Sequence, residues 1–222
     1  MGRVHITDPE AAGPHDLVRA ARAEGVRDER VLRALGRIRR DRFVPEEWAK
    51  RAYVDRPIPI PRGQVTTQPS LVARMVEGLR LSGTERVLEV GTGYGYQTAI
   101  LSELAASVVS IERFDDLAAQ ARANLAREGI DHVIVVVGDG TLGVSDRAPY
   151  DAIVVAAASP MVPPPLVEQL VERGRLVHPV GPGGMEDVTS FRKELGRLAS
   201  QGVATPAHFV PLVGEHGLPD SQ

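Results

Sequence analysis

One segment, VLEVGTGYGYQTAI at residues 87–100, constrains this chain more than any other part of it. Its apolar first half is typical of a buried strand, and it runs into Gly91, Gly93 and Gly95 before helix-forming residues resume. Glycines allow a tight turn and let a ligand approach the backbone closely. The free N–H groups at the start of the following helix attract anionic groups. The segment therefore predicts a strand–turn–helix unit that binds a nucleotide-like cofactor.

The spacing of these glycines narrows the choice of cofactor. A dinucleotide fingerprint needs G-x-G-x-x-G after a strand, but here the third glycine comes one residue early and Tyr96 fills its place. No G-x-x-x-x-G-K-[ST] motif is present, which argues against a nucleoside triphosphatase. G-x-G-x-G after a strand is the pattern of S-adenosylmethionine (SAM) methyltransferases. The alternative, a glycine-rich turn without a ligand, is disfavoured because three close glycines cost backbone entropy.

Composition removes several other classes of function. The 222 residues carry a formal net charge of −3, so no bulk attraction to nucleic acid is expected. There is no cysteine, which excludes disulfides, thiolate metal sites and a cysteine nucleophile. With one Trp, four Tyr and four Phe, an aromatic platform for base stacking is not expected. The six histidines show no paired metal spacing, so we expect no metal.

The lengths of the apolar runs indicate the cellular location of the protein. The first residues lack the apolar stretch of a signal peptide. No run approaches the roughly 18 apolar residues of a membrane span. We therefore expect a cytoplasmic protein with no membrane partner, and we expect a monomer.

The first part of the chain is predicted to be helical. Apolar residues at helical spacing predict helices over 16–24 and 28–40, with Asp28 as the cap of the second. The arginine-rich run RIRRDR at 37–42 is interpreted as a solvated helix end that suits the helix dipole, rather than as a binding patch.

An extended loop and a third helix are expected next. Three prolines in the five residues 57–61 force an extended path. The amphipathic pattern of SLVARMVEGLRL predicts a helix over 70–81. Residues 1–80 are thus expected to form helices and a substrate loop that pack on a cofactor-binding core formed by residues 81–222.

From Arg86 the pattern changes to apolar runs that alternate with helical stretches. Continuous Val and Ile runs of this kind indicate a parallel sheet that is buried on both faces. The expected strands are 87–90, 107–112, 132–139, 151–158 and 174–181, and the expected helices end near 106 and cover 115–128 and 166–173. The predicted fold is α/β: a doubly wound, mostly parallel, Rossmann-like sheet with an N-terminal helical extension and closing antiparallel strands near the C-terminus.

Polar residues follow several strands where the apolar residues stop, and ligands of doubly wound sheets bind at such carboxyl ends. The Glu112 carboxylate can accept both ribose hydroxyls of adenosine, or it caps the next helix or pairs with a surface Arg. Asp139 lies between two glycines. Either its carboxylate accepts a hydrogen bond from the adenine N6 amine, or Asp139 is an ordinary turn residue. Glu89 either receives the cofactor's ammonium group or braces the glycine turn. The small residues 156–158 leave room for a substrate.

The glycine turn is one of a series of motifs along the chain. The others include RFVPEEW (42–48), Y-x-D-x-P-x-P-I (53–60), GQVTTQPSLVARM (63–75), VVSIE, GDGTLG, YDAIVVAAASPMVPPPLVEQL, GRLVHPVG and HFVPLVG. Together, over about residues 14–217, they resemble the protein-L-isoaspartate O-methyltransferase family. Many SAM methyltransferases have G-x-G-x-G, but the GQ-x-x-[ST]-QP segment before it is distinctive of this family.

The resemblance implies an activity. These enzymes transfer the methyl group of SAM to the free α-carboxylate of isoaspartyl residues in damaged proteins and peptides, leaving S-adenosylhomocysteine. The ester then cyclises to a succinimide, which reopens partly to normal aspartate. The nucleophile is a carboxylate with a reference pKa near ~4, so it is ionised at neutral pH and needs no general base. Catalysis then reduces to aligning that carboxylate with the methyl group.

The resemblance also implies roles for residues. Thr67 stands where the family has Ser or Thr and would donate to the substrate carboxylate, although by residue type alone a turn residue bonding its own backbone is favoured. The cofactor-binding residues implied are Glu89, Gly91, Thr92, Gly93, Tyr94, Gly95, Gln97, Thr98, Glu112, Arg113, Gly138, Asp139 and Gly140. The substrate-binding residues implied are Thr66, Gln68 and the backbone near Val210, Leu212 and Val213.

Two departures from the family pattern leave the substrate open. The sequence reads VTT at 65–67 where TIS is common, and Ala156 stands where Thr is common. One alternative is therefore a specialised carboxyl methyltransferase of the same family that acts on Asp in a dedicated peptide. Another is a SAM-binding protein without catalysis. Nucleic-acid methylation is disfavoured, since the chain lacks a basic excess and an N-P-P-[YF] motif.

Overall fold

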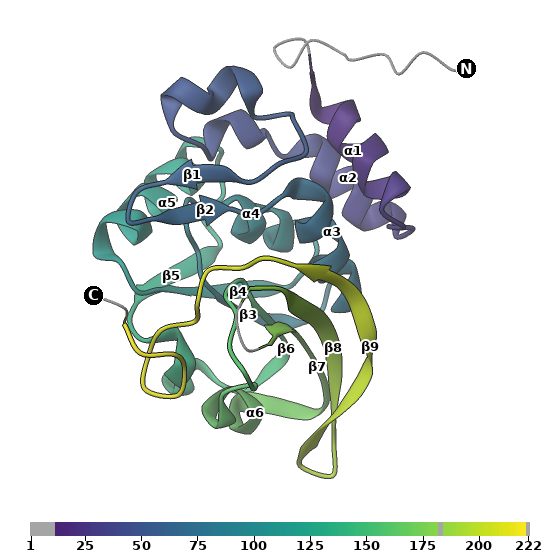
Figure 1. Ribbon diagram of the computed structural model, residues 1–222, viewed down its shortest axis with the longest axis vertical. Helices are drawn as coiled ribbons and strands as arrows, with labels where there is room; N and C mark the ends of the chain where they lie inside the picture. Colours follow the sequence, from purple (N-terminus) through teal and green to yellow (C-terminus); the bar gives the residue numbers. More distant parts are fainter. Residues whose placement is uncertain (1–11, 182–183, 221–222) are drawn as a thin grey trace.

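A seven-stranded sheet forms the centre of the protein (Figure 1). The structure, a computed structural model, describes residues 12–181 and 184–220. The strands of this sheet are β3 (Arg86–Val90), β4 (Ser107–Glu112), β5 (Val133–Val137), β6 (Tyr150–Val155), β7 (Leu170–Val180), β8 (Glu186–Glu194) and β9 (Arg197–Ala207). Their order is β5-β4-β3-β6-β7-β8-β9. Strands β3 to β7 pair in parallel, and β8 and β9 are added by antiparallel pairing, which confirms the predicted α/β fold.

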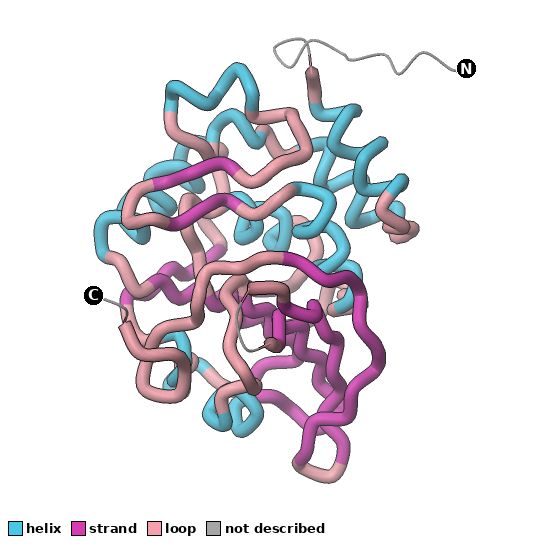
Figure 2. The backbone as a smooth tube through the Cα atoms, in the orientation of Figure 1, coloured by secondary structure: helices cyan, strands magenta, loops and turns pink. Residues whose placement is uncertain are grey.

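The helices lie around this sheet, as the cyan segments of Figure 2 show. They are α1 (Pro14–Ala23), α2 (Glu29–Arg37), α3 (Pro69–Gly78), α4 (Tyr96–Ser102), α5 (Asp115–Arg127) and α6 (Pro164–Gln169). Short 3-10 turns cover Arg40–Arg42, Glu46–Arg51, Gly140–Leu142 and Ser145–Arg147. Within the described ranges, none of these helices is both long and apolar enough to cross a membrane.

Successive side chains of a strand point to opposite faces of the sheet, so each face has its own hydrophobic core. Val87 of β3 packs in one cluster with Leu17 of α1 and Leu35 of α2. Its neighbour Leu88 packs in the other cluster, with Leu166 of α6. Burial of such side chains contributes about 1.5–3 kcal/mol each. Because both faces of the central strands β3 and β6 are covered, most residues of these two strands are apolar on both faces.

The arginine-rich run after α2 differs from the expectation. Asp28 caps the helix as predicted, since its side chain accepts from the Arg30 N–H at 2.8 Å. The helix ends at Arg37, because Ile38 adopts an extended ψ of 124°. The following turn carries Arg40 into the interior, where its side chain has no exposed surface. The interpretation of this run as a solvated helix end is therefore wrong for Arg40.

The helix predicted over 166–173 is also shorter than expected. It ends at Gln169, and β7 begins at Leu170, which pairs with Tyr150 of β6. Arg173 has a φ of 67°, a left-handed conformation that cannot continue a right-handed helix. Lys193 Nζ donates to the carbonyl oxygen of Leu170 at 2.7 Å, so the next strand holds this junction.

Two segments lie over the carboxyl ends of the parallel strands. One is the hairpin of β1 (Ile58–Ile60) and β2 (Gln64–Thr66), which pair antiparallel. The other is the segment after β9, drawn in yellow in Figure 1, which crosses in front of the sheet. It is attached where Pro211 forms a bridge with Ala158, just beyond the end of β6. These two segments cover the edge at which the sequence predicts a ligand.

Candidate active site

The glycine turn after β3 needs its glycines. Gly91, Gly93 and Gly95 have φ values of 94°, 55° and 91°, a region that residues with a Cβ avoid. Gly95 is the N-cap of α4, so the turn delivers the chain directly into that helix. The predicted strand–turn–helix unit is thus present, and its backbone lies at the carboxyl edge of the sheet.

Glu89 supports this turn from beneath. Its carboxylate is fully buried and accepts from Gln97 Nε2 at 3.0 Å, from Ser110 Oγ at 2.6 Å and from the Thr98 hydroxyl. Burial raises the pKa of Glu89 to about 7, although these hydrogen bonds act in the opposite direction. With its oxygens engaged below the surface, Glu89 braces the turn in this structure, one of the two roles that the sequence left open.

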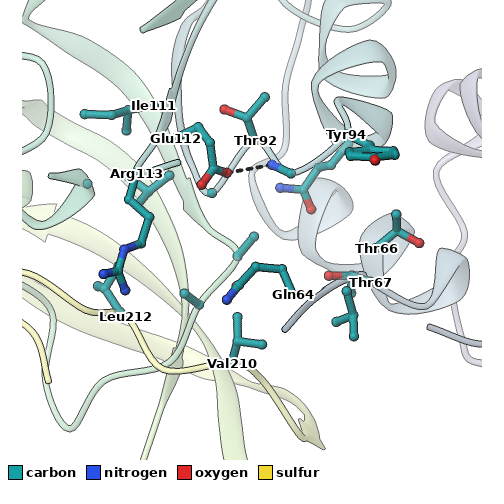
Figure 3. A pocket seen from close by; sticks show the side chains of 18 of the residues that line it. Gln64, Thr66, Thr67, Thr92, Tyr94, Ile111, Glu112, Arg113, Val210 and Leu212 are labelled. Carbon is teal, nitrogen blue, oxygen red and sulfur yellow. Dashed lines mark hydrogen bonds between the residues drawn. The ribbon is translucent and has the colours of Figure 1, made fainter. Parts of the chain in front are cut away.

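Glu112 lies at the end of the neighbouring strand and faces a cavity. Its carboxylate accepts from the Gly93 N–H at 2.8 Å and from the Phe114 N–H at 3.1 Å. Burial raises the pKa of Glu112, partly offset by these backbone hydrogen bonds. The carboxylate is thus oriented by the glycine turn itself, and Figure 3 shows this hydrogen bond as the dashed line.

The cavity lies between the strand ends, the β1–β2 hairpin and the C-terminal segment (Figure 3). Of the residues expected at the site, it is lined by Thr66, Thr67, Gly91, Thr92, Gly93, Tyr94, Gln97, Glu112, Arg113, Gly140, Val210, Leu212 and Val213. The expected residues that do not line it are Gln68, Glu89, Gly95, Thr98, Gly138 and Asp139. The structure therefore brings most of the predicted residues together around one space.

Thr66 and Thr67 are held differently within this cavity. The Thr66 hydroxyl accepts from Arg40 Nη2 at 3.0 Å, and the Thr67 carbonyl oxygen accepts from the same atom at 3.3 Å. Within the described residues, the Thr67 hydroxyl forms no hydrogen bond. Thr67 thus presents a free donor to the cavity, while the bond to Thr66 holds the end of β2, directly before Thr67.

Arg40 is a positioning residue that sequence reasoning missed. Besides the threonines, its guanidinium donates to the carbonyl oxygens of Ala52, Val54 and Arg56 at 2.8–3.0 Å. Burial lowers the pKa of Arg40 to about 10, so the group stays charged at neutral pH. A charged fork of this shape suits several carbonyl oxygens at once. No signal in the sequence separates this arginine from the exposed arginines beside it.

Gln68 lies just behind the threonines rather than in the cavity. Its Nε2 donates to Asp55 Oδ2 at 2.9 Å. Asp55 also accepts from the backbone N–H and the hydroxyl of Ser70, at 2.8 and 2.7 Å. Asp55 therefore ties the start of α3 to the loop before β1, and Gln68 belongs to this clamp.

The C-terminal segment offers fewer backbone donors than the sequence suggests. The Leu212 N–H already donates to the Ala158 carbonyl oxygen at 2.7 Å, and residue 211 is a proline without an N–H. Among the described residues, the Val210 and Val213 N–H groups have no hydrogen-bond partner. Within residues 210–213, these two are the amides that can still serve a ligand.

Asp139 holds the C-terminal segment in this structure. One carboxylate oxygen accepts from the N–H and the hydroxyl of Thr141, at 2.8 and 2.7 Å, and the other accepts from the Glu215 N–H at 2.7 Å. Burial alone would raise the pKa of Asp139, but these hydrogen bonds lower it below its usual value. Arg113 adds an ion pair of 2.6 Å to Asp220 further along the same segment.

Several lining residues were not singled out from the sequence as site residues, among them Gln64, Val65 and Tyr96. Tyr96 is buried, and its hydroxyl has no hydrogen-bond partner among the described residues. Such an unpaired buried hydroxyl is a candidate contact for a ligand. Within residues 12–181 and 184–220, no group of three or more His, Asp or Glu side chains could hold a metal ion.

Known proteins match this chain over most of its length. A family model described as protein-L-isoaspartate(D-aspartate) O-methyltransferase matches residues 13–217. A protein-L-isoaspartate O-methyltransferase of Methanoculleus marisnigri is 53% identical over 88% of this chain and 89% of its own length. One from Methanoregula boonei is 48% identical over 87% of this chain and 88% of its own length.

Solved structures agree with these sequence relatives. A structure described as protein-L-isoaspartate O-methyltransferase superposes with a TM-score of 0.81 at 29% identity, over 92% of this chain and 67% of that one. A Plasmodium falciparum structure in complex with S-adenosyl-L-homocysteine has a TM-score of 0.77 at 21% identity. It covers 90% of this chain and 98% of that one, and at this identity the likeness supports the fold.

Proposed function

Because the chain belongs to the protein-L-isoaspartate O-methyltransferase family, we propose that two walls of its cavity divide the methyl transfer between them. The protein is a SAM-dependent carboxyl O-methyltransferase that acts on isoaspartyl residues of proteins and peptides. The strand ends and the glycine turn hold SAM, and the β1–β2 hairpin and the C-terminal segment hold the isoaspartyl group. One observation carries this division: Glu112 and Thr67 line the same cavity from different elements.

The residues of the first wall fit the adenosyl part of SAM. The Glu112 carboxylate is oriented by the Gly93 and Phe114 N–H groups and has further lone pairs that can accept ribose hydroxyls. The apolar side chains of Val90 and Ile111 line the same space and suit the flat base. When bound, SAM supplies a methyl group on a positively charged sulfur.

The residues of the second wall suit a carboxylate that is already ionised. The Thr67 hydroxyl is free to donate to it, and the Val210 and Val213 N–H groups can grip the peptide backbone beside it. No residue has to remove a proton, because a carboxylate is deprotonated at neutral pH. The contribution of Thr67 is therefore to hold one carboxylate oxygen, so that the other faces the methyl group.

The two departures from the family pattern both lie at this cavity. Val65 lines it with 39% of its surface exposed, and Ala156 lines it next to Gly91. The second candidate function is therefore the same methyl transfer on a different substrate. The protein would esterify the carboxylate of an ordinary Asp in one dedicated peptide.

The test is methyl transfer from radiolabelled SAM to two synthetic peptides that differ only in Asp or isoAsp at one position. We expect label on the isoAsp peptide alone, as a base-labile methyl ester. Preferential labelling of the Asp peptide would replace repair by the dedicated function. SAM binding without labelling of either peptide would favour a non-catalytic SAM-binding protein.

Further proposals concern organisation and setting. We propose that residues 1–80 form the substrate-holding extension and residues 81–222 the SAM-binding core, in one compact unit. We also propose that the protein works in the cytoplasm, as a monomer and without a metal. Its proposed partners are isoaspartyl proteins and peptides, and not nucleic acid or a membrane. Light scattering during size-exclusion chromatography tests the monomer directly.

A further inference from the structure

A second cavity lies away from the proposed active site. It is formed by the end of α3 and by the β7–β8–β9 part of the sheet, whose last two strands extend together at the bottom of Figure 1. It shares no lining residue with the first cavity, and its volume of about 370 Å³ lies in the range of ligand sites, about 300–1,000 Å³. Four of its lining residues are arginines: Arg80, Arg173, Arg175 and Arg192.

Most of this positive charge is uncompensated. Arg175 pairs with Glu85 at 3.1 Å and donates to the Arg80 carbonyl oxygen at 2.9 Å. Over the residues that the structure describes, Arg80, Arg173 and Arg192 form no ion pair. A concave surface with one sign of charge concentrates counter-ions. The chain as a whole is negative, with a net charge of −3, so the cavity is a local exception.

The sheet places two of these arginines face to face. Arg175 of β7 lies directly opposite Arg192 of β8 in the antiparallel register, and both line the cavity. Like charges directly opposite each other destabilise an antiparallel pair. Glu85 relieves only part of this repulsion, since it contacts Arg175 alone. A bound anion between the two guanidinium groups would remove the remainder.

Backbone conformation gives an independent observation. Arg80 and Arg173 have φ values of 48° and 67°, in the left-handed region where glycine costs least. Both positions nevertheless carry a long cationic side chain at the cavity. Strained backbone of this kind collects at functional sites. The arginines at these two positions thus occupy a backbone conformation that carries a local cost.

We propose that this cavity binds an anion of the polyphosphate class. Guanidinium groups match phosphate oxygens in bidentate geometry, and several unpaired ones around one cavity suit several linked phosphates. Ser190 and Gln201, which also line it, can add neutral donors. A nucleic-acid duplex is the poorer fit, because the charges converge on a cavity instead of following a stripe, and the chain has few aromatic residues for stacking.

The test is calorimetric titration of the full chain with inorganic tripolyphosphate at physiological salt, with S-adenosylhomocysteine at saturation so that the first cavity is filled. Arg80→Gly and Arg173→Gly each remove one guanidinium and also relieve the left-handed backbone, so both variants should fold. Arg62→Gly is the matched control: Arg62 also has a φ of 65°, lies outside the cavity and pairs with Asp116.

We expect one tripolyphosphate site per chain, with affinity falling about tenfold or more in each cavity variant and unchanged in Arg62→Gly. If the cavity recognises the phosphate chain itself, both cavity variants should lose affinity for ATP to the same extent as for free tripolyphosphate. Absence of saturable binding overturns the proposal. So do equal losses in all three variants, or tighter binding of a DNA duplex than of tripolyphosphate. Methyl transfer measured without phosphate should be the same in both cavity variants as in the wild type.

Discussion

Arg40 Nη2 donates to the Thr66 hydroxyl at 3.0 Å, and this bond links the N-terminal helical part to the strand that leads into Thr67. The same guanidinium holds carbonyl oxygens of the loop before β1. Its group also lies 5.6 Å from the centre of the Tyr96 ring, which lines the cavity beside the glycine turn. One buried side chain thus sets the position of the proposed substrate wall relative to the cofactor wall.

Replacing Arg40 should affect the substrate more than the cofactor. Arg40→Lys keeps a charge but cannot reach all of these oxygens with one ammonium group. Several buried acceptors then lose their donor, and we expect a loss of about 3 kcal/mol or more in the free energy of unfolding. In urea denaturation the midpoint should fall. At temperatures where the variant stays folded, KM for an isoAsp peptide should rise while the SAM dissociation constant changes little.

Arg37→Ala serves as the control for Arg40. Arg37 belongs to the same arginine-rich run, but its side chain is 76% exposed and pairs with Glu103 on the surface. Its removal should leave both the denaturation midpoint and KM close to wild type. If Arg37→Ala and Arg40→Lys behaved alike, the buried arginine would have no special role in positioning the threonines.

Glu112→Ala should weaken SAM binding. The carboxylate would accept one or two ribose hydroxyls, each such charged hydrogen bond being worth roughly 1.5–3 kcal/mol. The substitution also releases the Gly93 and Phe114 N–H groups that the carboxylate now orients. Calorimetry on Glu112→Ala and on Glu103→Ala, a surface carboxylate, measures the difference. An unchanged SAM affinity in Glu112→Ala would move the ribose contact to another residue.

Glu89 should make stability depend on pH in one direction. Its pKa is raised from 4.5 to about 7, so between these values the folded state holds a proton that the unfolded state has released. The contribution of Glu89 to the free energy of unfolding therefore falls as the pH rises from about 4.5 to 7. Chemical denaturation at pH 5 and pH 8 should show this fall in the wild type. In Glu89→Gln, which cannot titrate, the fall should be smaller; an identical pH dependence would contradict the raised pKa.

Much of the cofactor side could be predicted from the sequence, because it rests on short-range patterns. The glycine spacing and the apolar runs predict the turn and the strands, and Glu112 ends its strand at the carboxyl edge, where a doubly wound sheet binds its ligands. The shared motifs add the threonines of the β2 segment. These residues meet because parallel strands end at the same edge of one sheet.

The substrate side depends on contacts that no local pattern records. Arg40 looks like its exposed neighbours in sequence and differs only because Ile38 ends the helix and turns it inward. Asp139 looks like a ligand of the base, but in this structure its carboxylate is engaged by Thr141 and Glu215, a residue 76 positions away. Long-range partners of this kind emerge only when the chain is folded.

The most direct test of the division between the two walls is Thr67→Val, which keeps the shape of the side chain and removes the hydroxyl. We expect its SAM dissociation constant to match that of the wild type. Turnover of an isoAsp peptide should fall by about 10- to 100-fold, the value of one hydrogen bond to a charged group, and Thr67→Ser should restore most of it. Equal turnover in Thr67→Val and wild type would contradict the account and place the carboxylate contact elsewhere in the cavity.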